Sequence, residues 1–237
     1  MEIFKQTLGD IVGGSVLDIA TQRGGFVQIL IDNLQSYTEI TGIDISEEAI
    51  AAAQSAFDQE NIQFIPMDAG QLDFADGRFD TVSLCASLHH MVNIPQVLAE
   101  AMRVLKPGGH FILVEMYREG ETEAQLTRVY VHHWAAAVDT ALGICHNKTL
   151  ARQEFVDYMD KLALGDVVYH DFSDTASDPM AEEMIASHEE VIEKYIQRIA
   201  GTADYAPLKQ QGEALRQRLR TVGMQSEPFL VVVGRKI

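Results

Sequence analysis

Three aspartates follow short apolar stretches in the first third of the chain, and their placement suits the binding of a polar ligand. Asp18 ends an apolar stretch that begins at Ser15, Asp44 ends "EITGID", and Asp68 follows "IQFIPM". If these stretches are parallel strands, their carboxyl ends meet at one edge of a sheet, where such folds bind ligands. A carboxylate at Asp44 can accept two hydrogen bonds from a ribose diol. One at Asp68 can accept from an exocyclic adenine amine. The alternatives are a helix cap for Asp44, where Ser46 is better placed, and a turn residue for Asp68.

The stretch "LDIATQRGGF" (17–26) resembles a nucleotide-binding turn that lacks some of its glycines. A strand-to-helix turn offers free backbone N–H groups to a phosphate or a carboxylate. The dinucleotide fingerprint G-x-G-x-x-G is matched poorly, by Ala20, Gln22 and Gly25. A negative φ at Ala20 would make that replacement nearly neutral. Gln22 then either accepts a strained conformation, at a cost of about 1–3 kcal/mol, or replaces a backbone contact with its amide.

Arg23 and Cys85 are further candidates near this edge. Arg23 could pair with a ligand carboxylate, although an exposed, solvated arginine is an equal alternative. Cys85 ends the fourth apolar stretch. Its thiol could act as a nucleophile, but a small buried apolar filler is the more common role of a free cysteine.

Two groups of histidines could act in acid–base or metal chemistry. His89 and His90 follow the fourth stretch, where either imidazole could serve as a general base. The structural alternative is that they hydrogen-bond the loop and close the pocket. In "YVHHW" (130–134), Tyr130, His133 and Trp134 share one helical face, whereas the adjacent His132 and His133 point apart. No HxxxH spacing occurs, even counting His146 and His170, so we expect no metal site. We expect aromatic–histidine packing instead, or an apolar acceptor site.

The elements that would position these residues alternate between strands and helices up to about residue 116, which is typical of a parallel sheet wound with helices. We expect helices at 24–34, 47–58 and 94–105, the last ending at a "KPGG" turn. The expected strands are "SVLDIA" (15–20), "EITGID" (39–44), "IQFIPM" (62–67), "FDTVSLCA" (79–86) and "HFILVEM" (110–116).

After Glu115 the pattern becomes mainly helical. We expect helices within 121–163, a sixth strand at 166–172, a helix over 178–201 capped by Asp178 and stopped by Gly201, and a last strand at 227–236. The added helices could cover the substrate as a lid, or serve core packing and a homodimer contact.

Composition excludes several classes of protein. The 237 residues carry a net charge of −17, and the densest basic group, "LRQRLR" (215–220), is expected on a solvated helix face, so a nucleic-acid partner is not expected. Apolar runs such as "FLVVV" fall short of the roughly 20 residues that cross a membrane, so neither insertion nor a secretion signal is expected. Cys85 and Cys145 provide no disulfide framework, which favours a cytoplasmic protein.

Taken together and in order, several motifs resemble those of class I S-adenosylmethionine-dependent methyltransferases, in particular small-molecule enzymes of the quinone-biosynthesis kind. The resemblance covers about residues 10–116 and rests on "VLDIATQRGG", "TGIDISEEAI", "IQFIPMDAGQLDFADGRFDTV", "SLHHM" and "VLKPGGHFILVE".

This resemblance implies a role for each matching position. Asp18 would lie beneath the loop, and the backbone from Ala20 to Gly24 would wrap the methionine end of the cofactor. Asp44 would hold the ribose, Ile45 would contact the adenine, and the residues matching the adenine-amine contacts are Asp68 and Ala69. Cys85 would lie near the methyl sulfonium. The stretch "CASLHH" replaces the Asn/Asp-Pro-Pro-aromatic motif of amine- and base-methylating branches, which disfavours DNA bases and glutamine as acceptors.

We therefore expect an α/β protein with a Rossmann-like, doubly wound, mostly parallel sheet of about seven strands and an added helical segment. Residues 1–116 would form the cofactor-binding core and 117–165 a helical substrate cap. Residues 166–237 would add the sixth strand, a long helical insertion and the final strand. The expected activity is in-line methyl transfer from S-adenosylmethionine to a small-molecule methyl acceptor. A non-catalytic S-adenosylmethionine-binding protein and a nicotinamide oxidoreductase are the alternatives.

Overall fold

The computed structural model describes residues 2–237 and shows a seven-stranded sheet in the order β3-β2-β1-β4-β5-β7-β6. The neighbouring pairs from β3 to β5 are parallel, and β7 is antiparallel to both β5 and β6. The expected α/β fold with a mostly parallel sheet is therefore confirmed. The strands are β1 (Ser15–Ile19), β2 (Glu39–Asp44), β3 (Ile62–Pro66), β4 (Phe79–Cys85), β5 (Leu105–Met116), β6 (Leu164–Phe172) and β7 (Phe229–Lys236).

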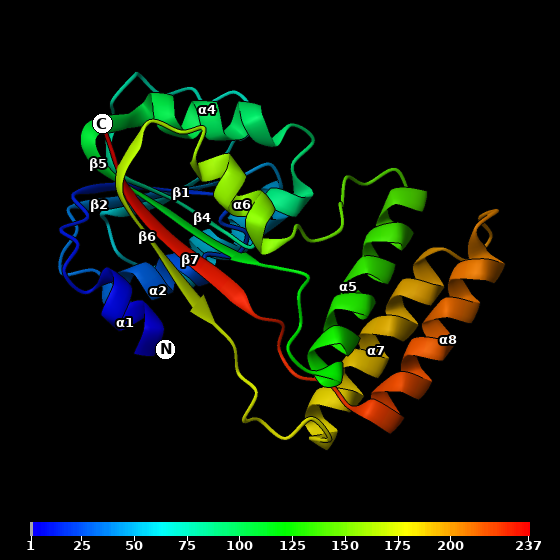
Figure 1. The fold of residues 1–237 in the computed structure, drawn as a ribbon. Coiled ribbons are helices and arrows are strands. Elements are labelled where there is room, and N and C mark those ends of the chain that lie inside the picture. The colour runs from blue at the N-terminus through cyan, green and yellow to red at the C-terminus, as the bar shows by residue number, and fades with distance from the viewer. Residues whose placement is uncertain (1) are drawn as a thin grey trace.

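Helices cover both faces of this sheet (Figure 1). One face packs against α1 (Glu2–Leu8), α2 (Gly25–Asn33) and α3 (Glu47–Ala56), and the other against α4 (Ile94–Val104) and α6 (Arg152–Met159). Central strands such as β1 are buried along their whole length, as expected for parallel strands covered on both sides. This burial fixes the strand ends that carry the site.

Three further helices form a second layer beyond the sheet. They are α5 (Glu123–Ala141), α7 (Glu182–Arg198) and α8 (Tyr205–Val222), and Figure 1 shows them standing side by side, apart from the strands. Their apolar sides form a separate cluster around Trp134, whose indole N–H donates to the carbonyl of Leu208 at 2.8 Å. We refer to α5, α7 and α8 as the helical layer.

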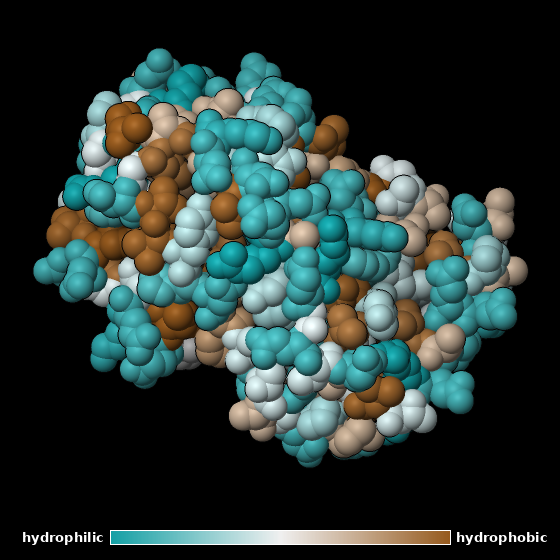
Figure 2. Space-filling model, viewed as in Figure 1, coloured by the Kyte–Doolittle hydropathy of each residue, from teal (hydrophilic) through white to brown (hydrophobic). Residues whose placement is uncertain are grey.

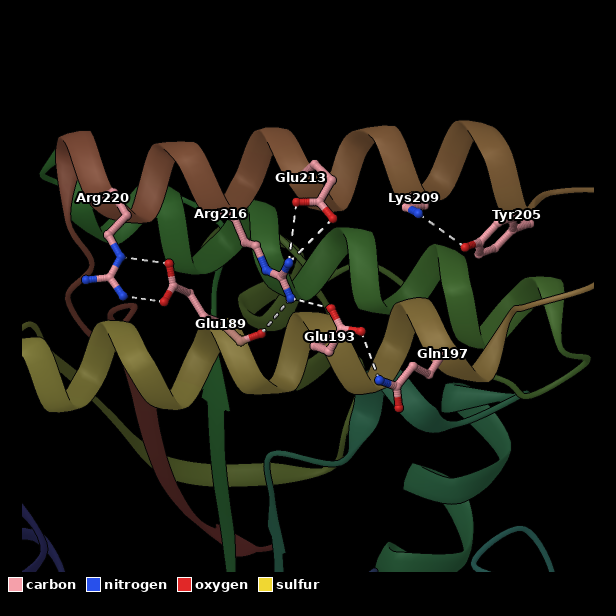
Figure 3. Close-up of polar contacts among 8 residues, drawn as sticks. All are labelled: Glu189, Glu193, Gln197, Tyr205, Lys209, Glu213, Arg216 and Arg220. Atoms are coloured by element: carbon pink, nitrogen blue, oxygen red, sulfur yellow. Dashed lines mark hydrogen bonds and ion pairs between the residues drawn. The ribbon is translucent and has the colours of Figure 1, made fainter.

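Ion pairs join the exposed sides of α7 and α8. Figure 3 shows Arg216 contacting Glu193, at 2.6 Å, and Arg220 contacting Glu189. Arg220 also contacts Glu182 at 2.8 Å. The segment "LRQRLR" lies on a largely exposed helix face, and its arginines pair there with carboxylates of neighbouring helices.

Three expected boundaries also need correction. Strand β5 begins at Leu105 rather than after a "KPGG" turn, and its register with β4 shifts between Phe79 and Thr81. Asp178 does not cap α7, because its carboxylate accepts from the Met180 N–H in a preceding turn and the helix starts at Glu182. At the other end, α7 stops at Arg198, before Gly201.

The view in Figure 2 shows hydrophilic residues over much of the surface, with hydrophobic residues gathered at the left, over the sheet part of the molecule. Val168 on the edge strand β6 and Ile237 are among the exposed hydrophobic residues. Among residues 2–237, no helix has the length and apolar character needed to cross a membrane.

Candidate cofactor site

The candidate site lies where β1, β2, β3 and β4 end. A cavity of about 440 Å³ opens there, a size typical of small-molecule sites. Most of the predicted cofactor residues line this cavity, although they are far apart in the sequence. Its lining consists of Ala20, Gln22, Asp44, Ile45, Met67, Asp68, Ala69, Gly70, Ser87, His90, Met91, Val92, Asn93, Gln96 and Val97.

The turn after β1 adopts a left-handed backbone at three positions. The φ angles are 57° at Ala20, 50° at Gln22 and 83° at Gly24. The negative φ that would make Ala20 a nearly neutral replacement is therefore not observed, and Gln22 takes the strained conformation that was one of its two alternatives. Such a conformation costs a non-glycine residue on the order of 1–3 kcal/mol, and it persists only where surrounding contacts hold it.

Asp44 provides one of those contacts. One carboxylate oxygen accepts from the Gln22 N–H at 2.9 Å, and the other accepts from the Ser46 N–H at 2.9 Å. Ser46 in turn caps α3 through the Ala49 N–H, as expected. Because each carboxylate oxygen has a second lone-pair direction, Asp44 can still accept from a ligand hydroxyl.

The cavity has an apolar rim beside these carboxylates. Ile45 is 77% exposed and Val92 is 89% exposed, and both line the cavity. Asp68 lies on the same wall, where its carboxylate accepts from the Gly70 N–H at 2.8 Å. An apolar surface beside a carboxylate acceptor suits an adenine ring with its amine.

Asp18 lies below the loop, where it is almost fully buried and does not line the cavity. One carboxylate oxygen accepts from Ser83 Oγ at 2.7 Å, and the other has no hydrogen-bond partner among residues 2–237. Burial raises the pKa of Asp18 to about 6. A buried, unpaired carboxylate oxygen here fits an ammonium or N–H donor entering from the cavity side.

Arg23, Gly24 and Cys85 lie outside the cavity lining. Arg23 is 74% exposed and faces Glu48 at 3.7 Å on the outer surface. Burial first, and then the carboxylates of Asp18 and Glu115, raise the pKa of the Cys85 thiol well above its usual range. A thiol that stays protonated suits the filler role better than a nucleophilic one.

The two candidate bases, His89 and His90, separate. His90 lines the cavity, and its pKa is lowered to about 4 by desolvation first and then by His89 and His146. His89 points inward and is buried against Glu115, with 3.4 Å between its Nδ1 and Oε2 of the carboxylate. The paired motif therefore contains one ring facing the cavity and one ring facing the protein interior.

Glu115 is a functional residue that the sequence reasoning missed. It is 1% exposed, and it accepts from the backbone N–H groups of Ser87 at 2.6 Å and Leu88 at 2.7 Å. These bonds fix the loop that carries His89 and His90. The available signal was an acidic residue directly after the apolar stretch "FILV" of β5.

The aromatic–histidine face of α5 lies elsewhere. Tyr130, His133 and Trp134 share one side of the helix, as expected, and line a separate open cleft with Lys148 and Arg218. His132 points away from this cleft, toward His146. The two clefts have no lining residue in common among residues 2–237, and the helical layer contributes none to the cofactor cavity.

Comparison with known proteins agrees with this geometry. Residues 17–113 match the family model described as a methyltransferase domain. The chain is 32% identical over 111 residues to a demethylmenaquinone methyltransferase of Lactococcus lactis, covering 46% of this chain and 44% of the relative. It is 35% identical over 107 residues to the ubiquinone/menaquinone biosynthesis C-methyltransferase UbiE of Desulfotalea psychrophila, covering 45% and 43%. The chain thus spans less than half the length of these relatives.

Solved structures show the same fold at low identity. A Bacillus halodurans protein has a TM-score of 0.64 at 19% identity, with 99% of this chain and 97% of that chain covered. The [4+2]-cyclase SpnF also has a TM-score of 0.64, at 18% identity, with 99% and 78% covered.

The segment 17–113 thus resembles a class I methyltransferase domain, and the matching family uses S-adenosylmethionine as methyl donor. The predicted family and cofactor class are therefore confirmed. This chain is distantly related to the quinone-biosynthesis methyltransferases named above.

Proposed function

We propose that this chain transfers the methyl group of S-adenosylmethionine to a small-molecule acceptor. The observation that carries the proposal is the gathering of Asp44, Ile45, Asp68 and Ala69 around one cavity at the carboxyl edge of the sheet. These residues come from two separate strand ends, and each matches a cofactor position of the domain family. The named relatives methylate small molecules, which supports the acceptor class.

The residues present fit this cofactor. Asp44 would accept from the ribose hydroxyls, Ile45 would contact the adenine face, and the adenine-amine contacts would come from Asp68 and Ala69. The left-handed turn from Ala20 to Gly24 would wrap the methionine end, with the unpaired oxygen of Asp18 behind it. S-adenosylmethionine supplies an activated methyl group, because its sulfonium is already a good leaving group.

The contribution of the protein is then mainly alignment. Holding the acceptor in line with the methyl group and sulfur makes an intermolecular step effectively intramolecular, which supplies much of the rate. An acceptor that must lose a proton also needs a base. His90 is the residue placed for this role, since its imidazole lines the cavity.

The acceptor itself would be selected outside the matched segment. Residues 114–237 lie beyond the family match and include the whole helical layer. We therefore do not carry a quinone acceptor over from the relatives. A neutral or cationic acceptor suits the net charge of −17 better than an anionic one.

Calorimetric titration of the full chain with S-adenosylmethionine and S-adenosylhomocysteine tests the proposal. We expect both to bind, and we expect S-adenosylhomocysteine release when a panel of phenols, amines, thiols and acidic carbon compounds is supplied. His90→Gln should lower turnover of the proton-losing acceptors and leave cofactor affinity unchanged. Absence of binding at millimolar cofactor would overturn the proposal.

The main alternative is a domain that binds the cofactor without transferring its methyl group. The strained Gln22 and the engagement of both Asp44 oxygens with backbone N–H groups favour it, because both features leave less of the turn free for the cofactor. The fold is also shared with a [4+2]-cyclase, so fold does not determine the reaction. Binding without turnover across the panel would support this alternative.

A further inference from the structure

Three buried histidines from separate parts of the chain meet beside the cofactor cavity. His89 lies in the short 3-10 helix Leu88–His90, His132 lies on α5, and His146 lies in the segment between α5 and α6. They are 4%, 9% and 8% exposed. One ring nitrogen of each lies within 4.8 Å of those of the other two. We refer to these three residues as the histidine cluster.

Carboxylates behind two of the rings set their orientation. Asp139 Oδ2 lies 2.7 Å from Nδ1 of His146, and Glu115 Oε2 lies 3.4 Å from Nδ1 of His89. At His89 the two atoms are close without being hydrogen-bonded. At His146 the contact leaves Nε2 facing away from Asp139 and toward His132. Histidine ligands of metals commonly donate their other ring N–H to a carboxylate in this way.

The third ring completes a converging set. Nε2 of His132 lies 3.1 Å from Nε2 of His146, close to the separation of about 3.4 Å between two ligand nitrogens of a tetrahedral zinc ion. The remaining, wider separations would close as the rings turn toward an ion. Asp139 is itself held by Arg198 at 2.7 Å and by the Tyr195 hydroxyl at 3.3 Å. The carboxylate that orients His146 is therefore fixed in position.

The charges around the cluster favour a cation. Glu115 is buried, and its Oε2 has no hydrogen-bond partner among the described residues, nor has Nδ1 of His89. Without an ion, one N–H shared between His132 and His146 would satisfy that pair but would leave Oε2 of Glu115 and Nδ1 of His89 without partners. A buried carboxylate without a cationic partner is costly, and a nearby divalent ion would offset that cost.

We propose that His89, His132 and His146 bind one divalent first-row transition-metal ion, with zinc as the first choice. Three imidazoles and one open position are typical of zinc sites that bind a water or substrate oxygen, whereas calcium and magnesium prefer all-oxygen sites. The absence of an HxxxH motif led to the prediction of no metal site. That motif, however, detects only ligands that lie one turn apart on a single helix. Here the three ligands come from three segments.

The ion would connect the two parts of the molecule. His89 belongs to the loop after β4, and His132 belongs to the helical layer. His90, which lines the cofactor cavity, has its ring centre 4.2 Å from that of His146 and 4.3 Å from that of His89. The histidine cluster therefore lies directly behind the ring of His90, which forms part of the cavity wall. This inference goes beyond the proposed function and does not require methyl transfer.

The test uses the full chain without a histidine tag, stripped of metal with a chelator and then titrated with Zn²⁺ against a chromophoric competitor. We expect one ion per chain, a raised Tm on binding, and a visible spectrum of tetrahedral type when Co²⁺ is used instead. His132→Gln should weaken Zn²⁺ binding at least 100-fold and abolish the cobalt spectrum. His133→Gln is the matched control, because its ring contacts Thr149 at 2.8 Å on the other side of α5 and should change neither reading.

Asp139→Asn should lower the Zn²⁺ affinity 10- to 100-fold, the usual effect of removing a carboxylate behind a ligand histidine. Should His132→Gln fail to fold, the wild-type stoichiometry and cobalt spectrum decide by themselves. The proposal is overturned by a wild-type chain that binds no stoichiometric Zn²⁺, by an octahedral cobalt spectrum, or by equal affinities in His132→Gln and wild type. S-adenosylmethionine titration of the same samples is independent of these readings, so failure of the metal site and failure of the proposed function are distinguishable.

Discussion

The sheet core and the helical layer of this chain differ in what holds them together. The core buries central strands on both faces, and its polar groups gather at the strand ends around one cavity. The helical layer has a smaller apolar cluster around Trp134 and is bordered by arginine–carboxylate pairs (Figure 3). The family match covers residues 17–113 and stops before the helical layer begins. The difference is consistent with the proposed division, in which the core binds the cofactor and residues outside the matched segment select the acceptor.

The largest effect should come from breaking the helical layer. Trp134→Ala removes a 4% exposed indole and its hydrogen bond to Leu208, so we expect a loss of about 3–5 kcal/mol in the free energy of unfolding. Urea denaturation measures this loss. Calorimetry below the unfolding midpoint should give an unchanged S-adenosylmethionine affinity. Val191→Ala, on the exposed side of α7, is the control, and a large loss of cofactor affinity in Trp134→Ala would contradict the separation of roles.

The buried charge of the core should give a pH-dependent effect. The pKa of Asp18 rises from 3.8 to about 6 on folding, so the folded state favours the protonated form. The associated stability is present at low pH and is lost as the pH rises from about 4 to about 6. The stability of Asp18→Asn relative to wild type should therefore increase by about 2 kcal/mol between pH 4 and pH 7. Asp10→Asn, at an exposed position, should show no such slope in chemical denaturation.

At the cavity, Asp44→Ala should weaken S-adenosylmethionine binding by about 1.5–3 kcal/mol, the range for hydrogen bonds to a charged group. The loss should be visible by calorimetry as a tenfold or greater increase in Kd. Glu48→Ala, which removes an exposed carboxylate at the start of α3, is the matched control. An unchanged affinity in folded Asp44→Ala would place the ribose elsewhere.

The smallest effect concerns the turn itself. Gln22→Gly should raise the free energy of unfolding by about 1 kcal/mol, since glycine adopts a φ of 50° without strain. Gln63→Gly on the extended strand β3 should lower it by a similar amount. If Gln22→Gly is instead destabilised, the glutamine side chain makes a contact that outweighs the strain.

Strand ends and helix caps could be predicted from the sequence, because they depend on residues that are neighbours along the chain. The strand end at Asp44 and the cap at Ser46 are confirmed, because each depends on neighbouring residues, whereas β1 runs one residue past Asp18. The family resemblance then grouped the strand ends into one site. Most of the residues assigned in this way do line one cavity.

The remainder depends on contacts between distant segments. The histidine cluster combines residues from the loop after β4, from α5 and from the segment before α6, and no spacing along the chain indicates that they meet. The ion pairs of Arg220 could not be predicted, because its partners Glu182 and Glu189 belong to another helix. The start of β5 at Leu105 depends on pairing with β4, which overrides the turn preference of "KPGG".

The path of the chain through the helical layer has a consequence for protein engineering. The chain leaves the sheet after β5 to build α5, returns for α6 and β6, and leaves again to build α7 and α8 before β7 closes the sheet. The helical layer therefore consists of two inserts that share one apolar cluster. A chimaera that tests whether the helical layer selects the acceptor must transplant both inserts together, since either one alone would lack its packing partner.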